Sequence, residues 1–566
     1  MVPFSAKPSE NSDIIAKHPK LYISDSEIKE NYSYVSDGVN KKHKPEKIFY
    51  AERYGGDGIS FHGGGARCGY DGEIQIKGIG VNPLTSPSAD PHHRNGRCSL
   101  KSALSEFAWS KGLEKVLPFG TVCCLAVLAV NFHSANSRLT LKSNDRALIL
   151  REPALRLAHF DRATYFRPSH DRDAHRFSDV RRVEQMINLL PELLPRQESV
   201  SIDEWKTLDS REKLESGLQE FARRACIQGA YAGANLLLHN SSPSNIALDA
   251  RWLDLGSTVS LHPDKGYSEE NFDIAWSALQ WQMSPIYRGI LGVCIQADKY
   301  LFRGEKISGG IFERTMISSQ NIFSIELTRY MLAFAGLPMF LADVMCGFDV
   351  CQEWAKGVSK HMRDSLGSHV INRGYIKSRG DSSGSQCLNL FHYTFAREFN
   401  EPWVRNGNIG RHVVGRLSSL FSQILAITTE RAGEMGVSKE ALRIAISINA
   451  ILRAGNKGRL DFDSLSEFFS KLIDDCEENY KKSIEFIRDG VDKKGAEIEK
   501  KFRLDIVSMS SLIVEQDDGV VELRWRENIL IKKIDGNIVC CFDILSDAAV
   551  NIGKLMGKFG FLSNEI

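Results

Sequence analysis

Four polar residues, far apart along the chain, have the side chains needed to bind a nucleoside triphosphate together with its metal ion. They are Lys77, Glu106, Asn245 and Asp254, in that order. A lysine ammonium neutralises phosphate oxygens, and a glutamate paired with that lysine holds the ammonium in place. An amide oxygen and a carboxylate are hard oxygen ligands of the kind that Mg²⁺ prefers. Each residue type is common by itself, so the prediction depends on the set and its order.

The lysine and the glutamate fall on different predicted elements. In Glu73–Lys77 the isoleucines alternate with polar residues, which predicts a short strand with Gln75 and Lys77 on one face. Residues 99–117 read as an amphipathic helix, and Glu106 borders its apolar stripe, from which it can turn inward. That stripe consists of Leu100, Ala103, Leu104 and Phe107. Without such a partner, Lys77 would be an ordinary solvated lysine at a sheet edge.

The asparagine and the aspartate lie nine residues apart within the segment His239–Gly256. A short apolar stretch separates them, and a hairpin there would bring the amide oxygen and the carboxylate together as a Mg²⁺ site. The alternative is that Asn245 is an ordinary turn residue and that Asp254 caps a helix.

Two further segments carry candidate phosphate contacts. The glycines of Gly63–Arg67 would let main-chain N–H groups approach a nucleotide, although a flexible surface turn has the same composition. Two arginines flank Pro153, and they either pair with surface acids or bind an anion, for which a guanidinium fork is well suited. The candidate residues in these segments are Gly64, Gly65, Arg67, Arg151 and Arg156.

Length and composition set wider limits. A chain of 566 residues is expected to form two or three domains. Its 72 Lys and Arg nearly balance its 71 Asp and Glu, so neither nucleic acid nor an anionic membrane is expected as the main partner. The first residues lack the apolar core of a signal peptide, and the apolar run Val122–Phe132 is too short to span a bilayer, so it is expected to be a buried helix or strand. The twelve cysteines include no Cys-x-x-Cys, which favours reduced thiols in a cytoplasmic protein.

The patterning predicts an α+β protein in four segments. Residues 1–45 are polar and are expected to form a loosely held lead-in, 46–166 a β-rich region, 167–460 a helical region, and 461–566 a module of helices followed by β-hairpins. Predicted helices include Val183–Leu194, Leu214–Leu238, Phe272–Trp281 and long surface helices within Asp463–Lys501. Predicted strands include Ser137–Leu141, Ser511–Gln516, Val520–Arg526, Ile529–Ile534 and Asn537–Asp543, the last two joined by the turn Asp535-Gly536.

In these residues the chain resembles the selenoprotein O family of protein adenylyltransferases, which has a protein-kinase-like fold of two lobes. The family's Leu-Lys-Gly-Ala-Gly motif is similar to Ile76–Gly80, and its Asp-Gly-Arg segment ending in Glu-Phe is similar to Asn95–Phe107. The segment around the two arginines is similar but two residues shorter. His239–Gly256 resembles the family's metal-binding segment, including the nine-residue step. The resemblance covers about residues 50–260.

The resemblance implies that ATP binds inverted relative to protein kinases, so that AMP is transferred to a hydroxyl. It implies that Lys77 holds phosphate and that Glu106 orients it. Asn95 and Gly96 then lie at the phosphate end, with Asn95 standing where the family has an acidic residue. The remaining implied contacts are Arg151 and Arg156 with the terminal phosphates, and Asn245 and Asp254 with Mg²⁺.

One departure from the family pattern concerns the acceptor. The family's base aspartate is replaced by Ser244, and serine cannot act as a carboxylate base near neutral pH. An acceptor that is already anionic needs no base, so a peptide carboxylate could be adenylated, as in the maturation of a small secreted peptide such as a bacteriocin or microcin. The family's C-terminal redox-active cysteine or selenocysteine motif has no counterpart here.

Two other functional classes were weighed. A pseudoenzyme scaffold would bind nucleotide and position a partner enzyme through the C-terminal module, whose sheet edges could recruit another chain. Ser244 favours that alternative, whereas the retained metal pair argues against it. A hydrolase is disfavoured, because the Gly-x-Ser-x-Gly match at Gly380–Gly384 follows polar residues rather than an apolar strand and is expected to be a surface turn.

Overall fold

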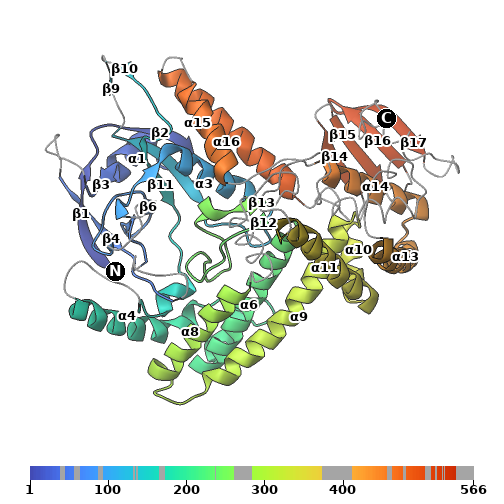
Figure 1. The fold of residues 1–566 in the computed structure, drawn as a ribbon, viewed down its shortest axis with the longest axis horizontal. Helices are drawn as coiled ribbons and strands as arrows, with labels where there is room; N and C mark the ends of the chain where they lie inside the picture. The colour runs from blue at the N-terminus through green and yellow to red at the C-terminus, as the bar shows by residue number, and fades with distance from the viewer. Residues whose placement is uncertain are drawn as a thin grey trace.

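The computed structural model has a nine-stranded sheet at one end and a four-stranded sheet at the other, with helices between them (Figure 1). It describes residues 1–37, 45–56, 64–86, 94–131, 134–135, 138–164, 172–235, 237–260, 283–371, 411–455, 462–475, 480–503, 511–516, 519–524, 527 and 529–543. The protein is 53% helical and 17% strand, and the paired strands of its larger sheets are antiparallel, which confirms the α+β prediction.

The large sheet is built from N-terminal strands in the order β2-β8-β11-β6-β5-β4-β1-β3, with β7 paired to β11. In this sheet Arg151 lies opposite Gln75 and Ile149 lies opposite Lys77, so strand pairing sets the spacing of several candidate residues. The strands are β1 (Val2–Pro8), β2 (Ser12–Lys17), β3 (Tyr34–Val35), β4 (Lys47–Ala51), β5 (Cys68–Tyr70), β6 (Gln75–Lys77), β7 (Cys98–Ser99), β8 (Cys124–Val130) and β11 (Arg146–Arg151).

The prediction of a loosely held lead-in is wrong for residues 1–37. Strands β1 and β2 pair with β4 and β8, and helix α1 (Asp25–Tyr32) begins at a Ser24 capping box. Buried Ile14 and Ile28 attach this segment to the core. Its lysines lie on the outside, as the ion pair of Lys29 with Asp13 at 2.5 Å illustrates. The segment looked polar because its apolar residues are few and well spaced.

Strand β8 explains the apolar run at Val122–Phe132. All residues from Cys124 to Val130 are buried, because separate apolar clusters cover the two faces of the sheet. A strand buried on both faces reads as a continuous apolar run instead of alternating. No helix in the described part of the chain is both long and apolar enough to cross a membrane.

Helix α3 (Leu100–Leu113) covers one face of the large sheet and carries Glu106. Its outer side is covered by α15 (Phe462–Asp474) and α16 (Tyr480–Phe502), which come from the far end of the sequence (Figure 1). Lys111 of α3 pairs with Asp492 of α16 at 2.6 Å, and Ser143 Oγ donates to Asp474 at 2.7 Å. Arg488 donates to the carbonyl of Ile14 in β2 at 2.7 Å. Helices α15 and α16 therefore form part of the N-terminal half of the fold, although they lie near the end of the sequence.

Helices α3 and α16 pack tightly at Gly112, where an added Cβ would lie 2.5 Å from Ile498 and 2.7 Å from the Gly495 carbonyl. We expect Gly112→Ala to lower the free energy of unfolding by about 1–2 kcal/mol, because overpacking outweighs the helix propensity gained. Gly433→Ala in α13 is the matched control, since no atom lies within 4 Å of its added Cβ. Equal melting temperatures for the two variants in thermal unfolding would contradict the predicted contact.

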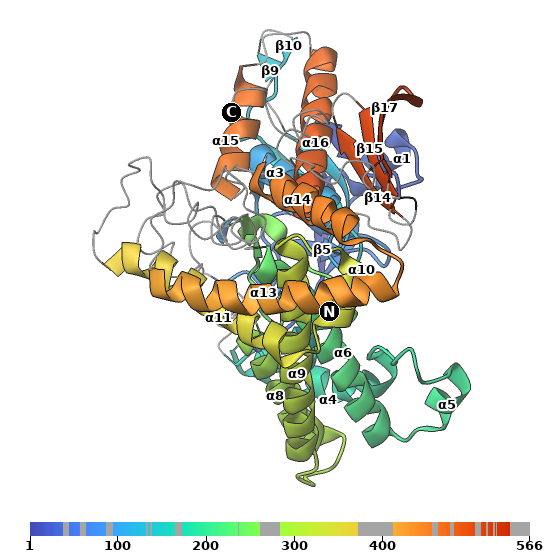
Figure 2. The same ribbon diagram turned by 90° about the vertical axis from the view of Figure 1, so that its right-hand side faces the viewer.

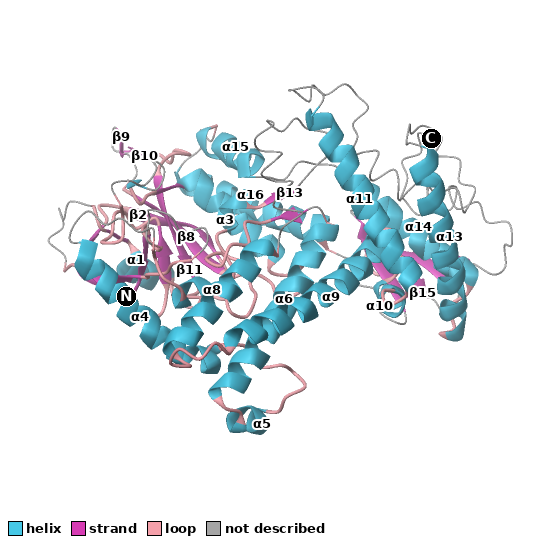
Figure 3. Cartoon of the chain, turned by 60° about the horizontal axis from the view of Figure 1, so that its bottom comes forward, coloured by secondary structure: helices cyan, strands magenta, loops and turns pink. Residues whose placement is uncertain are grey.

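The helical half, residues 167–460, contains α4–α6, α8–α11, α13 and α14 within its described ranges. Figure 2 shows α11 and α13 running side by side across one end of α9, and Figure 3 shows α9 between the two sheets. Two bounds differ from prediction: α4 starts well before Val183, and α6 ends at Ala234 because Leu237–Leu238 form a strand, β12, with β13 (Val259–Ser260). The helices are α4 (Arg172–Leu193), α5 (Ile202–Thr207), α6 (Ser210–Ala234), α8 (Ser284–Tyr300), α9 (Ser308–Phe334), α10 (Met339–Met345), α11 (Asp349–Ile371), α13 (Arg411–Glu434) and α14 (Lys439–Gly455).

The four strands predicted near the C-terminus form one antiparallel sheet in which each strand pairs with the next. Asp535 and Gly536 have φ values of 48° and 80°, and a two-residue hairpin turn with both central φ values positive is the favoured kind. This sheet lies near α14 in Figures 1 and 3, away from α15 and α16, so the two parts of segment 461–566 pack against different halves of the protein. Its strands are β14 (Ser511–Gln516), β15 (Gly519–Arg524), β16 (Ile529–Ile534) and β17 (Asn537–Asp543).

Three smaller predictions remain. The strand predicted at Ser137–Leu141 corresponds to β10 (Arg138–Leu139), which pairs with β9 (Ser134–Ala135). The helix predicted at Phe272–Trp281 and the motif at Gly380–Gly384 lie outside the described residues.

Candidate functional site

Lys77, Glu106 and Asp254 meet in one cluster, although they come from a strand, a helix and a turn. Lys77 Nζ donates to Glu106 Oε2 at 2.6 Å and also forms an ion pair with the Asp254 carboxylate. The side chains of Lys77 and Glu106 are 5% and 4% exposed, whereas that of Asp254 is 36% exposed. Asp254 is thus the member of the cluster that solvent and ligands can reach.

The charges in this cluster support one another. Burial disfavours the charged form of Lys77, but Asp254 and Glu106 outweigh it and raise the pKa of Lys77 above its ordinary value. Burial also opposes ionisation of Asp254, yet Lys77, Arg67 and Arg151 hold the pKa of that carboxyl well below its usual range. A fixed ammonium beside an ionised carboxylate is what binding of a phosphate–metal complex requires.

Arg151 lies on β11, deep beside the same glutamate. Its Nη1 is 3.6 Å from Glu106 Oε1, its Nη2 donates to Cys68 Sγ at 3.8 Å, and its Nε donates to Gln75. Despite burial, which opposes it, nearby Cys68, Glu106 and Asp254 raise the pKa of Arg151. Within the described residues Nη1 makes no hydrogen bond, even though the residue is only 4% exposed. A buried guanidinium with an unused N–H is a ready donor for an anion.

Arg156 approaches from the loop after β11. Its guanidinium lies 4.9 Å from the centroid of the Tyr54 ring, its Nη1 donates to the Ser244 carbonyl at 3.0 Å, and its Nη2 is 3.9 Å from Glu52. The Nε atom has no hydrogen-bond partner in the part of the chain that the structure describes, and the residue is 2% exposed. His159 accepts from the Arg156 backbone N–H, and burial followed by the nearby arginines keeps the pKa of that imidazole well below its ordinary value.

Asn245 and Asp254 flank a tight hairpin, as the sequence analysis expected. Ile246 pairs with Trp252, and the Leu253 N–H donates to the Asn245 carbonyl at 3.1 Å. The Asn245 side chain donates to the Asn240 carbonyl at 3.0 Å, which leaves its amide oxygen as the acceptor end. Asp254 has φ +58°, a left-handed conformation that is uncommon for residues other than glycine. Such local strain is concentrated at functional sites.

His239 packs against this hairpin. Its ring stacks on Trp252 with centroids 4.6 Å apart, and its Nε2 lies 3.3 Å from the Asn245 carbonyl. Burial lowers the pKa of His239 to about 4, so the imidazole is neutral under physiological conditions. His239 was not among the site residues predicted from the sequence.

Ser244 is buried beside the hairpin, and within the described residues its hydroxyl makes hydrogen bonds only with uncharged side chains. Its Oγ lies 2.8 Å from Ser242 Oγ and 3.5 Å from Asn245 Oδ1. These hydroxyl and amide contacts give it no means to accept a proton as a carboxylate would.

The structure places the predicted phosphate-contacting residues Gly64, Gly65 and Arg67 in different surroundings. Gly65 donates its N–H to the Glu52 carbonyl at 3.0 Å and accepts from Asn82 at 2.6 Å, so its backbone serves the fold instead of facing a ligand. Gly64 has φ +90° and packs against Tyr54. Arg67 does join the cluster: burial opposes its charge, but Asp254, the nearby thiols and Glu106 raise its pKa.

Asn95 and Gly96 form a turn near the end of the lysine motif. Asn95 is exposed and accepts the Arg97 N–H at 2.9 Å, which makes it a local turn residue. The Gly96 carbonyl accepts the Gly80 N–H at 3.1 Å, so Gly96 fixes the end of the Ile76–Gly80 segment. An added Cβ at Gly96 would collide with the Gly80 carbonyl.

Sequence reasoning missed three residues of the site, of which Glu52 and Gln75 are buried and Cys98 is partly buried. Glu52 and Gln75 form hydrogen-bonded links to the arginines, and Cys98 lies close enough to Lys77 and Arg67 to feel their charges. Burial raises the pKa of the Cys98 thiol to about 11. Gln75 could have been found from its place on the same strand face as Lys77, two residues away. No sequence pattern around Glu52 indicates that it belongs to the site.

The charges of this region do not cancel. Its cations are Lys77, Arg67, Arg151 and Arg156, and its carboxylates are Glu52, Glu106 and Asp254. Among the described residues, the region therefore holds one positive charge in excess, together with two buried guanidinium N–H groups without hydrogen-bond partners. An anion of several charges would satisfy both features.

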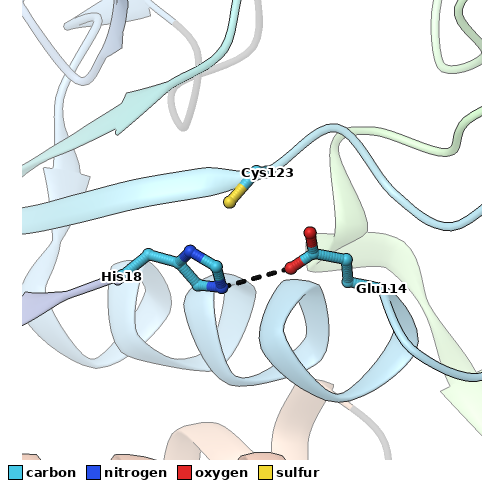
Figure 4. A group of neighbouring side chains, drawn as sticks. All are labelled: His18, Glu114 and Cys123. Carbon is cyan, nitrogen blue, oxygen red and sulfur yellow. Dashed lines mark ion pairs between the residues drawn. The ribbon is translucent and has the colours of Figure 1, made fainter. Parts of the chain in front are cut away.

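A second group of titratable side chains lies elsewhere, where β2, α3 and β8 meet. Figure 4 shows His18, Glu114 and Cys123 close together, with ligand atoms within 4.8 Å of one another. Both nitrogens of His18 are engaged: Nε2 pairs with Glu114 at 3.1 Å, and Nδ1 accepts the Lys20 N–H at 3.2 Å. The Lys20 ammonium also pairs with Glu114. A metal at Nε2 would require a proton on Nδ1, facing that N–H. We therefore interpret this group as a structural cluster in which Glu114 accepts a hydrogen bond from His18 and forms an ion pair with Lys20.

No family model matches this chain, and no curated protein sequence matches it either.

Proposed function

We propose that the protein is a Mg²⁺–ATP-dependent nucleotidyltransferase with a two-lobed, protein-kinase-like fold, which transfers AMP to a protein or peptide acceptor. The observation that carries the proposal is the meeting of Lys77, Glu106 and Asp254 in one buried cluster. The resemblance to the selenoprotein O family supplies the choice of AMP transfer over phosphoryl transfer.

The residues of the site fit a triphosphate. Lys77, positioned by Glu106, would hold phosphate oxygens, and the unused N–H groups of Arg151 and Arg156 would bind the terminal phosphates. Arg67 adds a further positive charge beside Lys77. These cations would stabilise the charge that develops on the departing pyrophosphate, which is the main contribution of proteins to such reactions.

The hairpin would supply the metal ligands. Asn245 offers an amide oxygen and Asp254 a carboxylate that is accessible from outside the cluster. Bound Mg²⁺ would neutralise phosphate charge and orient the oxygens around the α-phosphorus. The two ligands are held at the ends of one short hairpin, so their spacing is set locally.

The acceptor chemistry follows from Ser244. In the transfer, an acceptor oxygen forms a bond to the α-phosphorus while the bond to pyrophosphate breaks, so a hydroxyl acceptor must lose its proton to a base. A carboxylate acceptor carries no such proton and would give an acyl-adenylate. We therefore favour a peptide carboxylate, activated during peptide maturation, as the acceptor.

ATP labelled separately on the α- and γ-phosphorus tests the proposal. Incubation with Mg²⁺ and candidate peptides should transfer the α label, not the γ label, to the acceptor with release of pyrophosphate. Where the acyl-adenylate then condenses, the α label should leave as AMP. Mass spectrometry should show the gain of an adenylate or of a product condensed from it. Retention of the γ label alone would reject AMP transfer in favour of phosphoryl transfer.

Replacing Ser244 with alanine should change the transfer rate by no more than roughly threefold, against the roughly 10²–10⁴-fold effect of removing a general base. Among the described residues, its hydroxyl makes hydrogen bonds with Ser242 Oγ and Asn245 Oδ1, neither of which is a base. Initial rates with labelled ATP measure this. A loss of 10²-fold or more with unchanged ATP affinity would assign the hydroxyl a direct chemical role.

The second candidate is a pseudoenzyme scaffold that binds nucleotide and positions a partner enzyme. The observation that favours it is that Ser244 stands where a base is needed and that its hydroxyl contacts a hydroxyl and an amide. Exposed Ile538 and Val539 on β17 offer an apolar surface for such a partner. ATP binding without transfer to any acceptor, together with a stoichiometric partner that co-purifies, would support the scaffold.

A further inference from the structure

Two buried residues beside the candidate site connect its two arginines. Gln75 Nε2 donates to Glu52 Oε2, while Gln75 Oε1 accepts from Arg151 Nε. The Glu52 carboxylate also lies 3.9 Å from Arg156 Nη2. A primary amide has both a donor and an acceptor, so Gln75 can join a carboxylate to a guanidinium as no charged residue can. One carboxylate and one amide thus link two arginines from separate segments.

The link is built into the sheet. Arg151 and Gln75 are directly opposite one another on β11 and β6, so their side chains share one face. Gln75 is 1% exposed and Glu52 is 5% exposed, and neither side chain is available to solvent for another purpose. Such a buried polar link is costly unless every member is satisfied.

The link also decides which N–H groups the arginines can offer. Because Gln75 takes the Nε of Arg151, the Nη1 atom is directed to the side of Glu106, 3.6 Å away, and so toward the lysine of the cluster. Nη1 of Arg151 and Nε of Arg156 are the fully buried guanidinium nitrogens of this pair that have no hydrogen-bond partner within the described part of the chain.

We infer that Gln75, together with Glu52, is a positioning residue that holds Arg151 and Arg156 at the spacing needed to bind the terminal phosphates of the nucleotide. The inference rests on the proposed function, because it assumes a triphosphate in this site. Gln75 itself touches no phosphate and acts through the arginine. It should therefore matter for ligands with terminal phosphates and not for AMP.

Calorimetric titration of the full chain with ATP, tripolyphosphate and AMP, each with Mg²⁺, tests this. Gln75→Met has nearly the same size but no hydrogen-bonding amide. We expect it to weaken binding of ATP and tripolyphosphate about tenfold, the effect of losing one charge-assisted hydrogen bond. AMP affinity should stay within about twofold of the wild type, as expected for a residue that acts only at the terminal phosphates.

A charge swap provides the rescue. Gln75→Glu alone places two carboxylates together and should weaken ATP binding more than Gln75→Met does. The double variant Glu52→Gln with Gln75→Glu restores a donor at position 52 and an acceptor for Arg151 at position 75. We expect it to recover most of the ATP affinity lost in Gln75→Glu.

Asn449→Leu is the matched control for the loss of a buried amide. Asn449 is 5% exposed and donates to the Gly336 carbonyl at 3.0 Å in the helical half. It should lower the melting temperature without changing the ratio of ATP to AMP affinity. If Gln75→Met likewise lowers only the melting temperature, or weakens ATP and AMP equally, the positioning role is refuted while the proposed function stands. If the wild type binds neither ATP nor tripolyphosphate, both are refuted.

Discussion

Asp254→Asn should reduce AMP transfer by at least about 10²-fold, because it removes the charged member of the proposed metal-binding pair. The carboxylate is the most accessible member of the Lys77 cluster, with 36% of its side chain exposed, whereas its ion pair with Lys77 anchors it. Asparagine keeps the size and one oxygen of the side chain, so the hairpin that ends at Leu253 should persist.

The same variant should separate metal from phosphate binding. The region already has one positive charge in excess, so removal of a carboxylate should strengthen binding of ATP in the presence of EDTA. The gain in ATP affinity that Mg²⁺ confers on the wild type should disappear. Calorimetric titrations with and without Mg²⁺ measure both effects, and a Mg²⁺-dependent gain that survives in Asp254→Asn would show that the metal lies elsewhere.

Lys77→Met should destabilise the protein by about 3 kcal/mol and abolish transfer. Methionine fills the space of the lysine but leaves the buried Glu106 carboxylate without its 2.6 Å partner. Breaking a buried pair in this way costs about 3–5 kcal/mol, and the lower value applies because Arg151 remains 3.6 Å from Glu106.

A lysine in the helical half serves as the control for this prediction. The Lys213 side chain is 9% exposed and pairs at 2.7 Å with Glu192, whose side chain is 60% exposed. Lys213→Met leaves a solvated carboxylate, so it should cost less than about 1 kcal/mol. Chemical denaturation of both variants distinguishes the cases. Similar losses would indicate that Glu106 is neutral or is fully satisfied by Arg151.

The candidate site was predictable from sequence where its geometry is local. Strand alternation placed Lys77, helix periodicity placed Glu106 at the inner edge of its stripe, and the nine-residue step placed Asn245 and Asp254 on one hairpin. All four residues lie on or beside the expected elements. That Lys77 reaches both Glu106 and Asp254 depends on how these elements pack, for which the order of the motifs was only an indirect guide.

Features that depend on distant contacts were not predictable. Glu52 matters because β4 and β6 lie in one sheet, and no local pattern announces that it meets Gln75. The first 37 residues look polar because only one face of β1 and α1 is buried, and short strands give weak periodic signals. The backbone of Gly65 is used by Glu52 and Asn82, which composition cannot reveal.

The contact of α16 with α3 limits how early the protein can complete its fold during synthesis. Lys111 and Asp492 are 381 positions apart, and Arg488 reaches back 474 positions to Ile14. A ribosome must therefore complete most of the chain before the helix that holds Glu106 gains its outer cover. Until then the incomplete chain exposes an apolar flank of that helix. A chain that ends before residue 480 would therefore be prone to aggregation and would lack a stable candidate site for a triphosphate.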